Sequence, residues 1–263
     1  MALNLRSEVR RLRVFDLEQV RHQEPGQEWV PHWHEEWSFG AIVRGECRCS
    51  VAGRPFVART GDVIAIAPGV VHTGALSAPQ YQGSVLVAML YVPSDWLVHE
   101  GLRPPPRSGV ARMPRLAESA RGLVTTAEVQ AWLRRAVPAL RRSLPADPSA
   151  VEPVPPSAAV RALIERVQQA VAGGHLSVAD LANRCGVSRE RIHRVLTQWV
   201  GMAPGDYLRA VRLHRARQLL LAGEPAAAVA AECGFADQAH FTRWFRRSFG
   251  YTPGDLLQAA ERG

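Results

Sequence analysis

The chain has 263 residues, a length that suggests two domains rather than one. Its hydrophobic content of 47% is ample for folded cores. All 32 positive charges are arginine, against 24 acidic residues, and from position 158 onward 14 arginines stand against 9 acidic residues. A basic excess concentrated in the smaller C-terminal part favours a phosphate-binding surface over charge that only keeps a protein in solution. No apolar run reaches the ~20 residues of a membrane-spanning helix, so we expect no membrane partner.

The N-terminus and the cysteines indicate the compartment. Residues 1–13 are charged and lack an apolar core, which predicts that no signal peptide is present. Cys185 and Cys233 are expected to be small core residues, whereas Cys47 and Cys49 share one strand face and either pack inside the β region or join a metal or redox site, the former being favoured. We therefore expect a reduced, disulfide-free, cytoplasmic protein.

Residues 14–99 have the pattern of short β-strands separated by tight turns. The runs 39–43, 47–51, 63–66 and 84–92 are β-branched or alternate between apolar and polar residues. Glycine- and proline-containing segments lie between them, as turns between strands require. Strands this short and this evenly spaced predict a β-sandwich or a small barrel.

Three histidines give this β region a candidate binding site. His32 and His34 lie two residues apart, so an extended segment places both imidazoles on one face. The spacing Gly26-x5-His32-x-His34-x3-Ser38-x6-Gly45, followed by the run 61–72 that ends in His72, resembles the two motifs of the cupin family. The resemblance implies a jelly-roll barrel with a metal held by three histidines and one glutamate. Ser38 stands in the position of that glutamate.

Two kinds of ligand stay open for this site. The resemblance implies an organic effector bound by His32, His34, Trp37 and His72 at the mouth of the barrel. Alternatively, the three imidazoles hold a divalent transition metal, namely Zn, Ni, Cu or Fe, with an open fourth position. Trp29, Trp33 and Trp37 cluster in the same stretch and either stack on a ligand or close the barrel.

The period becomes helical over residues 115–144. Thr125 and Glu128 form a capping box. An apolar stripe follows, made of Val129, Trp132, Leu133, Ala136, Val137, Leu140 and Leu144. The stripe either packs on the β region or forms a two-helix dimer contact. Five prolines then fall in residues 145–157, a composition typical of an extended linker and thus of a domain boundary.

After an amphipathic helix over 158–172, the C-terminal region contains one structural unit twice. Cys185-Gly186 recurs as Cys233-Gly234, and the later pair Gly201 and Pro204 recurs as Gly250 and Pro253. In each copy a glycine fits the left-handed end of a first helix, and Ser188 or Asp237 caps a second. This unit is a helix-turn-helix, whose second helix enters the DNA major groove. A helix over 204–222 joins the two copies.

The exposed faces of the two second helices carry side chains of the types that read base edges in DNA. The alternative interpretation is an all-α domain whose basic faces are only solvated. The predicted DNA-contacting residues are Arg189, Glu190, His193, Arg194, Thr197, Gln238, Ala239, Thr242, Arg243 and Arg246. Glu190 is unusual, since an acidic side chain either accepts from a cytosine amino group or disfavours wrong sequences.

This region resembles the DNA-binding domain of the AraC/XylS family of transcription regulators. The motifs that carry the resemblance are Leu176-Ser177-x3-Leu181-Ala182, Arg212-x3-Ala216-x2-Leu219-Leu220, Gly234-Phe235-x-Asp237-Gln238-x2-Phe241-x-Arg243-x-Phe245 and Gly250-x-Thr252-Pro253. The resemblance implies two helix-turn-helix motifs on a shared helix, a cupin-like effector domain, and dimerisation through the apolar stripe of residues 125–144.

We therefore predict an α+β two-domain protein. Its parts are a cupin-like effector domain (1–112), a helical dimerisation segment (113–144), a linker (145–157) and a double helix-turn-helix domain (158–263). The predicted function is a ligand-responsive transcriptional activator, not an enzyme, that binds double-stranded DNA, a small-molecule effector and RNA polymerase as a homodimer. The alternatives are a metal-sensing regulator and a metal-dependent cupin enzyme with a DNA-binding tail.

Overall fold

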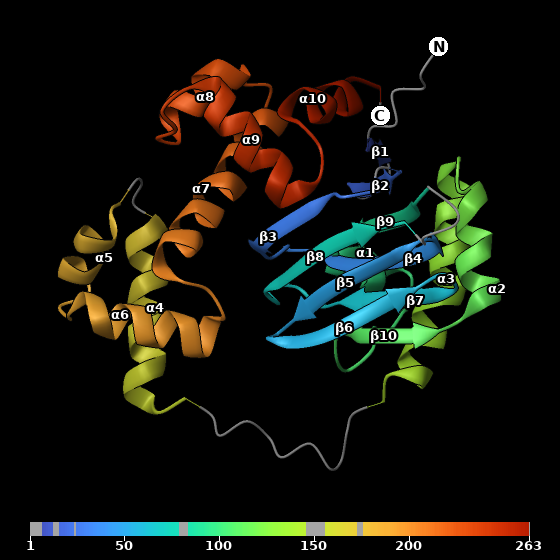
Figure 1. Cartoon of the computed structure of the whole chain (residues 1–263), viewed down its shortest axis with the longest axis horizontal. Coiled ribbons are helices and arrows are strands. Elements are labelled where there is room, and N and C mark those ends of the chain that lie inside the picture. Colours follow the sequence, from blue (N-terminus) through green and yellow to red (C-terminus); the bar gives the residue numbers. More distant parts are fainter. Residues whose placement is uncertain are drawn as a thin grey trace. The chain divides into compact units, whose positions relative to one another are not determined.

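The computed structural model describes residues 7–12, 16–23, 25–78, 84–145, 156–172 and 176–262 (Figure 1). The chain divides into two compact units, one made of Met1–Ala146 with Phe249–Gly263 and the other of Asp147–Ser248. The predicted linker falls mostly on residues 146–155, which lie outside the described residues. In the described part of the chain, no helix is both long enough and apolar enough to cross a membrane.

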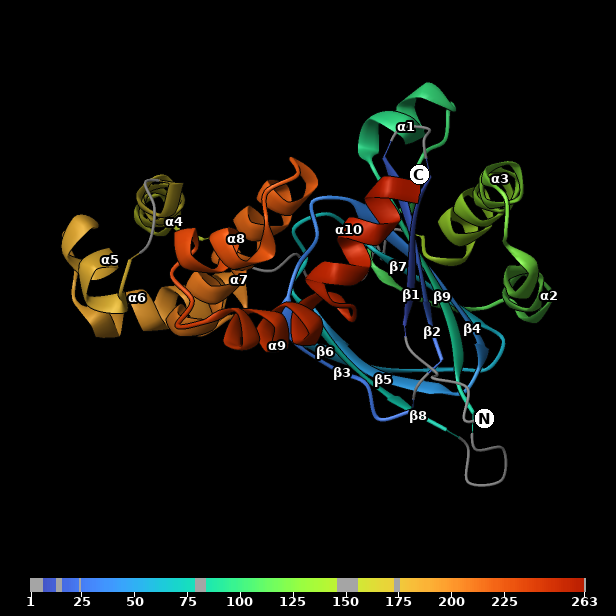
Figure 2. The same ribbon diagram turned by 90° about the horizontal axis from the view of Figure 1, so that it is seen from above.

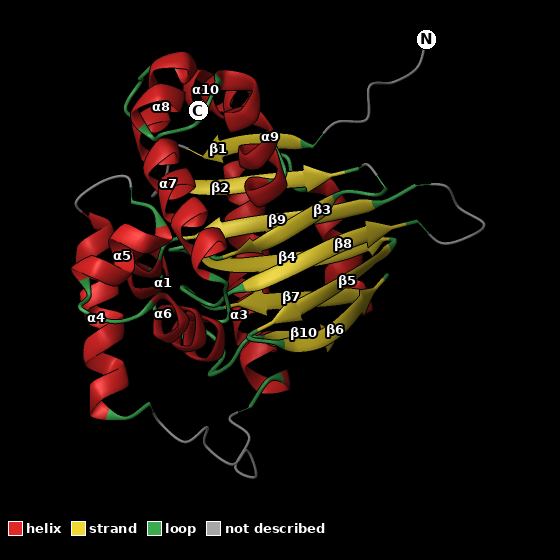
Figure 3. Cartoon of the chain, turned by 60° about the vertical axis from the view of Figure 1, so that its left-hand side comes forward, coloured by secondary structure: helices red, strands yellow, loops and turns green. Residues whose placement is uncertain are grey.

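The first unit contains two antiparallel sheets (Figure 3). The six-stranded sheet has the order β1 (Glu8–Leu12), β2 (Leu17–His22), β9 (Leu86–Val92), β4 (Trp37–Arg44), β7 (Asp62–Ile66) and β10 (Gly109–Arg112). The four-stranded sheet has the order β3 (Glu28–His32), β8 (His72–Ser77), β5 (Glu46–Val51) and β6 (Arg54–Arg59). The four predicted strand runs are confirmed. The two sheets form a jelly-roll-like sandwich rather than a closed barrel, which confirms the sandwich among the two predicted architectures.

Each strand of the larger sheet sends alternate side chains to opposite faces, because the side-chain period of a strand is two. On one face, Phe39, Val63 and Leu90 belong to a core shared with the helices. On the other, Ile42, Ile64 and Val87 belong to a core shared with the smaller sheet. Both faces of the central strands β4, β7 and β9 are therefore covered, which agrees with their nearly continuous apolar sequences.

Helices cover the face of the larger sheet that points away from the smaller one (Figure 2). They are α2 (Pro114–Ser119), the short 3-10 turn η1 (Ala120–Gly122) and α3 (Thr126–Ser143), while α1 (Ser94–His99) follows β9. The predicted capping box at the start of α3 is confirmed, since Thr125 Oγ1 accepts from the Glu128 backbone N–H at 3.2 Å. The Glu128 carboxylate accepts in return from the Thr125 N–H at 2.8 Å.

The apolar stripe of α3 is buried within its own domain, which corrects our expectation of a dimer contact. Leu133 and Leu140 are fully buried in the cluster that contains Phe39 and Leu90 of the sheet. Packing on the sheet is favoured because the odd-numbered residues of β4 and the even-numbered residues of β9 present an equally wide apolar surface to cover. The stripe is therefore not free to pair with a second copy.

The first unit also includes the C-terminal segment, in which α10 (Pro253–Arg262) packs against β1. Tyr251 is 2% exposed, and its hydroxyl donates to the Glu18 carboxylate at 2.7 Å. Glu18 is itself 2% exposed, so this charge-assisted hydrogen bond satisfies a buried carboxylate.

The second unit is helical and follows the predicted duplication. Its elements are α4 (Ala158–Ala172), α5 (Val178–Arg184), α6 (Arg189–Val195), the π-turn η2 (Leu196–Val200), α7 (Pro204–Leu221), α8 (Ala226–Glu232) and α9 (Gln238–Phe249). Gly186 and Gly234 have φ of 62° and 71°, which confirms the left-handed position predicted after the first helix of each motif. The predicted connecting helix is α7.

Candidate effector pocket and DNA-binding surface

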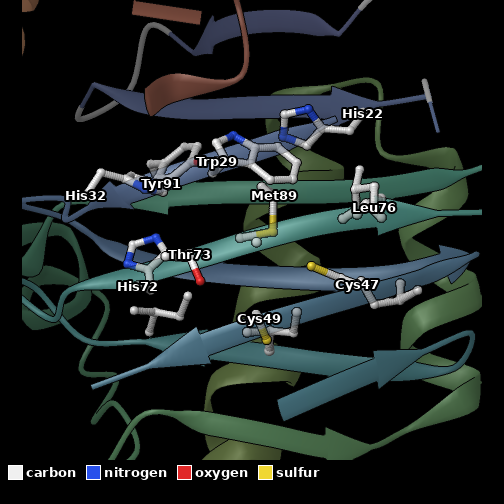
Figure 4. A pocket seen from close by; sticks show the side chains of 15 residues that line it. His22, Trp29, His32, Cys47, Cys49, His72, Thr73, Leu76, Met89 and Tyr91 are labelled. Carbon is white, nitrogen blue, oxygen red and sulfur yellow. The ribbon is translucent and has the colours of Figure 1, made fainter. Parts of the chain in front are cut away.

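A cavity of about 60 Å³ lies between the two sheets of the first unit (Figure 4). Its walls come from both sheets, because the residues that point away from the helices on β4, β7 and β9 face the inner side of β5 and β8. The lining residues are His22, Trp29, His32, Ile42, Cys47, Cys49, Ile64, Ile66, His72, Thr73, Gly74, Leu76, Val87, Met89 and Tyr91. The cavity is therefore mainly apolar, with imidazoles as its principal polar groups.

The three predicted histidines come together at this cavity. His32, His34 and His72 are 4%, 7% and 8% exposed, and one ring nitrogen from each lies within 4.8 Å of the other two. Nδ1 of His32 donates to the Val30 carbonyl at 2.7 Å, and Nδ1 of His72 donates to the Val70 carbonyl at 2.8 Å. Burial lowers the pKa of His72 to about 4, so this imidazole is neutral at physiological pH.

Two further aromatic residues line the cavity from its other side. His22 and Trp29 meet edge-to-face, with ring centroids 4.8 Å apart. Nδ1 of His22 shares a hydrogen bond of 2.9 Å with Ser7 Oγ, while its buried Nε2 has no partner among the described residues. Burial also lowers the pKa of His22, to about 3. The cavity thus contains one buried, unsatisfied polar nitrogen.

Trp37 was predicted to bind the effector, but it does not line the cavity. It lies on β4 in the cluster beneath the helices, where its ring stacks on Phe39 with centroids 5.7 Å apart. Trp29 lines the cavity in its place. Ser38, which stands where cupins have glutamate, is 1% exposed, and its hydroxyl has no hydrogen-bond partner among the described residues.

The cysteines all carry free thiols, which agrees with the expected reduced state. Cys47 belongs to the core between the sheets, and Cys49 packs against it, so their predicted place inside the β domain is confirmed. The hydrogen bond between the two thiols and burial raise the pKa of Cys47, which keeps this thiol protonated and unreactive. Cys185 and Cys233 are 1% and 2% exposed and are small core residues, as predicted.

The first helix-turn-helix exposes the predicted face of α6. Ser188 caps this helix by accepting from the Arg191 N–H at 3.2 Å, and Ile192 and Val195 are buried on its inner side. The predicted residues on the outer side, Arg189, Glu190, His193, Arg194 and Thr197, are all exposed. The sequence-based division of this helix into inner and outer faces is therefore correct.

Glu190 has a local structural role. Hydrogen bonds from its own backbone N–H and from the Ser188 side chain lower the pKa of its carboxyl group. The carboxylate thus lies at the N-terminus of α6, where the helix dipole favours negative charge. This accounts for an acidic residue on an otherwise basic face.

The second helix-turn-helix repeats this arrangement on α9. Asp237 caps the helix by accepting from the His240 N–H at 2.6 Å, and Phe241 and Phe245 are fully buried. Among the predicted contacts, Gln238, Ala239, Arg243 and Arg246 are exposed and Thr242 is partly exposed. Trp244 is partly buried, and the Arg209 guanidinium lies over it at 3.7 Å from the ring centroid.

Helix α7 is attached to both motifs. It packs on α5 and η2 of the first motif and on α8 of the second. Arg212 of α7 donates to the Gly234 carbonyl in the second motif's turn at 3.1 Å, and Arg215 pairs with Glu232 at 2.7 Å. Such contacts fix the two outer faces relative to one another within this unit.

Comparison with known proteins identifies both parts of the chain. Residues 15–159 match the model of the AraC-like ligand binding domain, and residues 181–259 match a helix-turn-helix domain. The chain belongs to the AraC family. This confirms the resemblance of the C-terminal motifs, and it identifies the β-rich unit as the family's ligand-binding domain.

Relatives named as transcriptional activators match part of the chain. The transcriptional activator RhaS of Escherichia fergusonii is 39% identical over 82 residues, and RhaS of Klebsiella pneumoniae is 39% identical over 83 residues. Each match covers 31% of this chain and 30% of the relative, so the chain spans under a third of these relatives' length. A variant of ToxT from Vibrio cholerae shares the fold, with a TM-score of 0.55 and 12% identity over 95% of this chain and 100% of that chain.

Sequence reasoning missed several cavity residues of this AraC-family protein. His22, Met89 and Tyr91 lie on β2 and β9, far in sequence from the histidine motif. Alternation along each strand divides its residues between two faces. The local sequence does not show which of these faces meets the second sheet. Only the pairing of β2 with β9, and of β9 with β4, brings these residues to the cavity.

Proposed function

We propose that this chain is an effector-responsive regulator of transcription that binds DNA in a sequence-specific manner. The observation that carries the proposal is the pair of exposed recognition faces on α6 and α9, both held by α7. The effector site in this proposal is the cavity lined by His32 and His72, with His34 beside it. We retain 158–263 as the DNA-binding domain because the helix-turn-helix match extends to residue 259.

The C-terminal segment offers a route from effector to DNA. A Cβ at Gly250 would lie 2.7 Å from His22 Cε1 and 2.8 Å from Trp29 Nε1, and both of these residues line the cavity. Phe249, the residue before it, is the last residue of α9. A ligand that displaces the His22–Trp29 pair therefore bears on the end of the second recognition helix. The response is a shift between conformations that bind DNA differently.

Further partners follow from the same proposal. The relatives' name, transcriptional activator, supports activation rather than repression, and activation implies contact with RNA polymerase. We also propose a homodimer acting in the cytoplasm, but with an interface other than the α3 stripe. We assign no catalytic role to the chain.

Footprinting of the full-length protein tests the DNA part of the proposal. We expect two protected segments about ten base pairs apart on one face of the DNA, since two recognition helices on one rigid helix enter successive major-groove segments about 34–36 Å apart. The DNA is first selected from a random pool by the full-length protein. A footprint confined to one segment would assign the second motif to another partner.

A divalent transition metal is a second candidate occupant of the cavity. One ring nitrogen from each of the three buried imidazoles lies within 4.8 Å of the other two. The Nδ1 hydrogen bonds of His32 and His72 to backbone carbonyls orient these rings, as similar hydrogen bonds do in metal-binding histidines. The donor set therefore fits Zn, Ni, Cu or Fe, although Ser38 supplies no carboxylate as a fourth ligand. Bound there, a metal would make the protein a metal-sensing regulator or, with an open position, a Lewis-acid enzyme.

Metal analysis of the purified full-length protein separates these alternatives. If the histidines hold a metal, we expect about one ion per chain by elemental analysis, and loss of it in His34→Ala, because removing one of three ligands typically costs far more than the 10–100-fold lost with an outer-shell partner. Thr73→Val, on the same cavity wall, is the matched control and keeps the ion. Metal-free protein that still binds selected DNA and responds to a small molecule would remove the metal alternatives.

A further inference from the structure

Apart from its imidazoles, the cavity contains no side chain that could neutralise a charged ligand. Its lining includes no arginine, aspartate or glutamate, although the chain has 32 arginines elsewhere. A carboxylate or an ammonium group placed between these sheets would lose its hydration without gaining a fixed counter-charge. Away from the three clustered histidines, the walls therefore select against charged organic groups.

One polar atom in the wall lacks a hydrogen bond. Nε2 of His22 is buried without a partner among the described residues, and the His22 side chain lines the cavity. Ser7 Oγ either donates to or accepts from Nδ1, so Nε2 is an acceptor in one tautomer and a donor in the other. Only a group that can both donate and accept satisfies this nitrogen in either case. A hydroxyl group does so, whereas a methyl group cannot.

The size of the cavity limits the rest of the ligand. A volume of about 60 Å³ holds roughly four to six water molecules at ~10–15 Å³ each. Their combined share of liquid volume, roughly 120–180 Å³ at ~30 Å³ each, is that of a single six-membered ring with few substituents. Figure 4 shows Trp29, Met89 and Tyr91 around this space, and they offer flat and polarizable surfaces to such a ring.

We propose that the cavity takes an uncharged, ring-sized molecule that carries a hydroxyl group, with the hydroxyl bound to Nε2 of His22. Phenols and cyclic alcohols of one ring are this class of ligand, and the corresponding carboxylates are excluded. The inference rests on the proposed function only where it calls this molecule the effector.

Calorimetric titration of the full-length protein with matched probes tests the inference. The probes are phenol, toluene and benzoate, then 4-methylphenol, 1,4-dimethylbenzene and 4-methylbenzoate, and cyclohexanol with methylcyclohexane and cyclohexanecarboxylate. All titrations contain a chelator, so that a metal at the three histidines contributes nothing. We expect the hydroxyl member of at least one series to bind at least tenfold more tightly than its carboxylate.

Variants locate the hydroxyl. In His22→Leu we expect the ratio of hydroxyl to methyl affinity to fall about tenfold, the effect of one lost hydrogen bond. Thr73→Val removes a neighbouring hydroxyl from the same cavity, and a fall of the ratio in this variant instead would place the ligand's hydroxyl on Thr73 and overturn the assignment to His22. If the His22 variant fails to fold, the wild-type comparison of hydroxyl with carboxylate still decides.

Three results would overturn the inference: tighter binding of the carboxylates, no binding of any hydroxyl probe, or an unchanged ratio in folded His22→Leu. The proposed function is judged separately by the footprint. If the protein binds selected DNA but none of the hydroxyl probes, the proposed function stands and the ligand inference is wrong. If it binds phenols but no DNA, the ligand inference stands and the proposed function is wrong.

Discussion

Replacing Leu133 by glutamate is expected to unfold the β-rich unit rather than to release folded monomers. Leu133 is fully buried on α3, in one cluster with Phe39 and Leu90 of the larger sheet. Losing a buried leucine side chain costs about 2–5 kcal/mol, and a carboxylate without a partner in the same place adds a desolvation cost. Because a typical domain is stable by only about 5–15 kcal/mol, most of its stability is lost.

Urea unfolding followed by near-UV circular dichroism measures this loss in the full-length chain. Arg135→Glu is the matched control, since it places the same charge two residues away on the exposed side of α3 and is expected to change the stability by under about 0.5 kcal/mol. Leu133→Glu protein that keeps its native spectrum and sediments as a monomer, where the wild type sediments as a dimer, would restore the stripe as the dimer contact.

The helical unit could be predicted almost completely because its signals are local. A capping side chain, a glycine at positive φ and an apolar face of period 3.6 all lie within about 20 residues of one another. Ser188 and Gly186 therefore have their predicted roles.

The β-rich unit could be predicted only in part, since its decisive interactions are between distant strands. Strand runs and the histidine motif were recognisable, but Trp37, which was grouped with Trp29 at the binding site, lies in the core beneath the helices. Trp29 belongs to β3 of the smaller sheet, whereas Trp37 begins β4 of the larger one. The register shift between Trp29 and His32, and the change of sheet after His34, break the simple parity that grouped these residues.

The use of the α3 stripe shows the same limit. Amphipathicity states that one face of a helix is buried, but it does not state against what. Family resemblance favoured a second copy of the chain, and the sheet of the same unit covers the stripe instead. What decides between the sheet and a second copy is the apolar face of the larger sheet, which the helices must cover. That face exists only once the six strands have paired.

Loss of both Arg194 and Arg243 is expected to abolish the preference of the protein for its selected DNA. Both side chains are exposed on the outer faces of α6 and α9, opposite the buried Ile192 and Phe241. An arginine that binds a guanine with two hydrogen bonds discriminates against the wrong base by about 1–3 kcal/mol. The two arginines lie in different motifs, so their effects are expected to add, to roughly 30–20,000-fold in the double alanine variant.

Gel-shift titration at fixed salt, with selected and scrambled DNA, separates base reading from charge. Arg166→Ala is the control, because this arginine is exposed on α4 outside both motifs and its loss removes the same charge. It is expected to leave the ratio between the two DNAs unchanged, since a phosphate contact contributes equally to every sequence. If Arg194→Ala and Arg243→Ala also weaken binding to both DNAs equally, then these arginines contact phosphates, and specificity comes from the other exposed residues of α6 and α9.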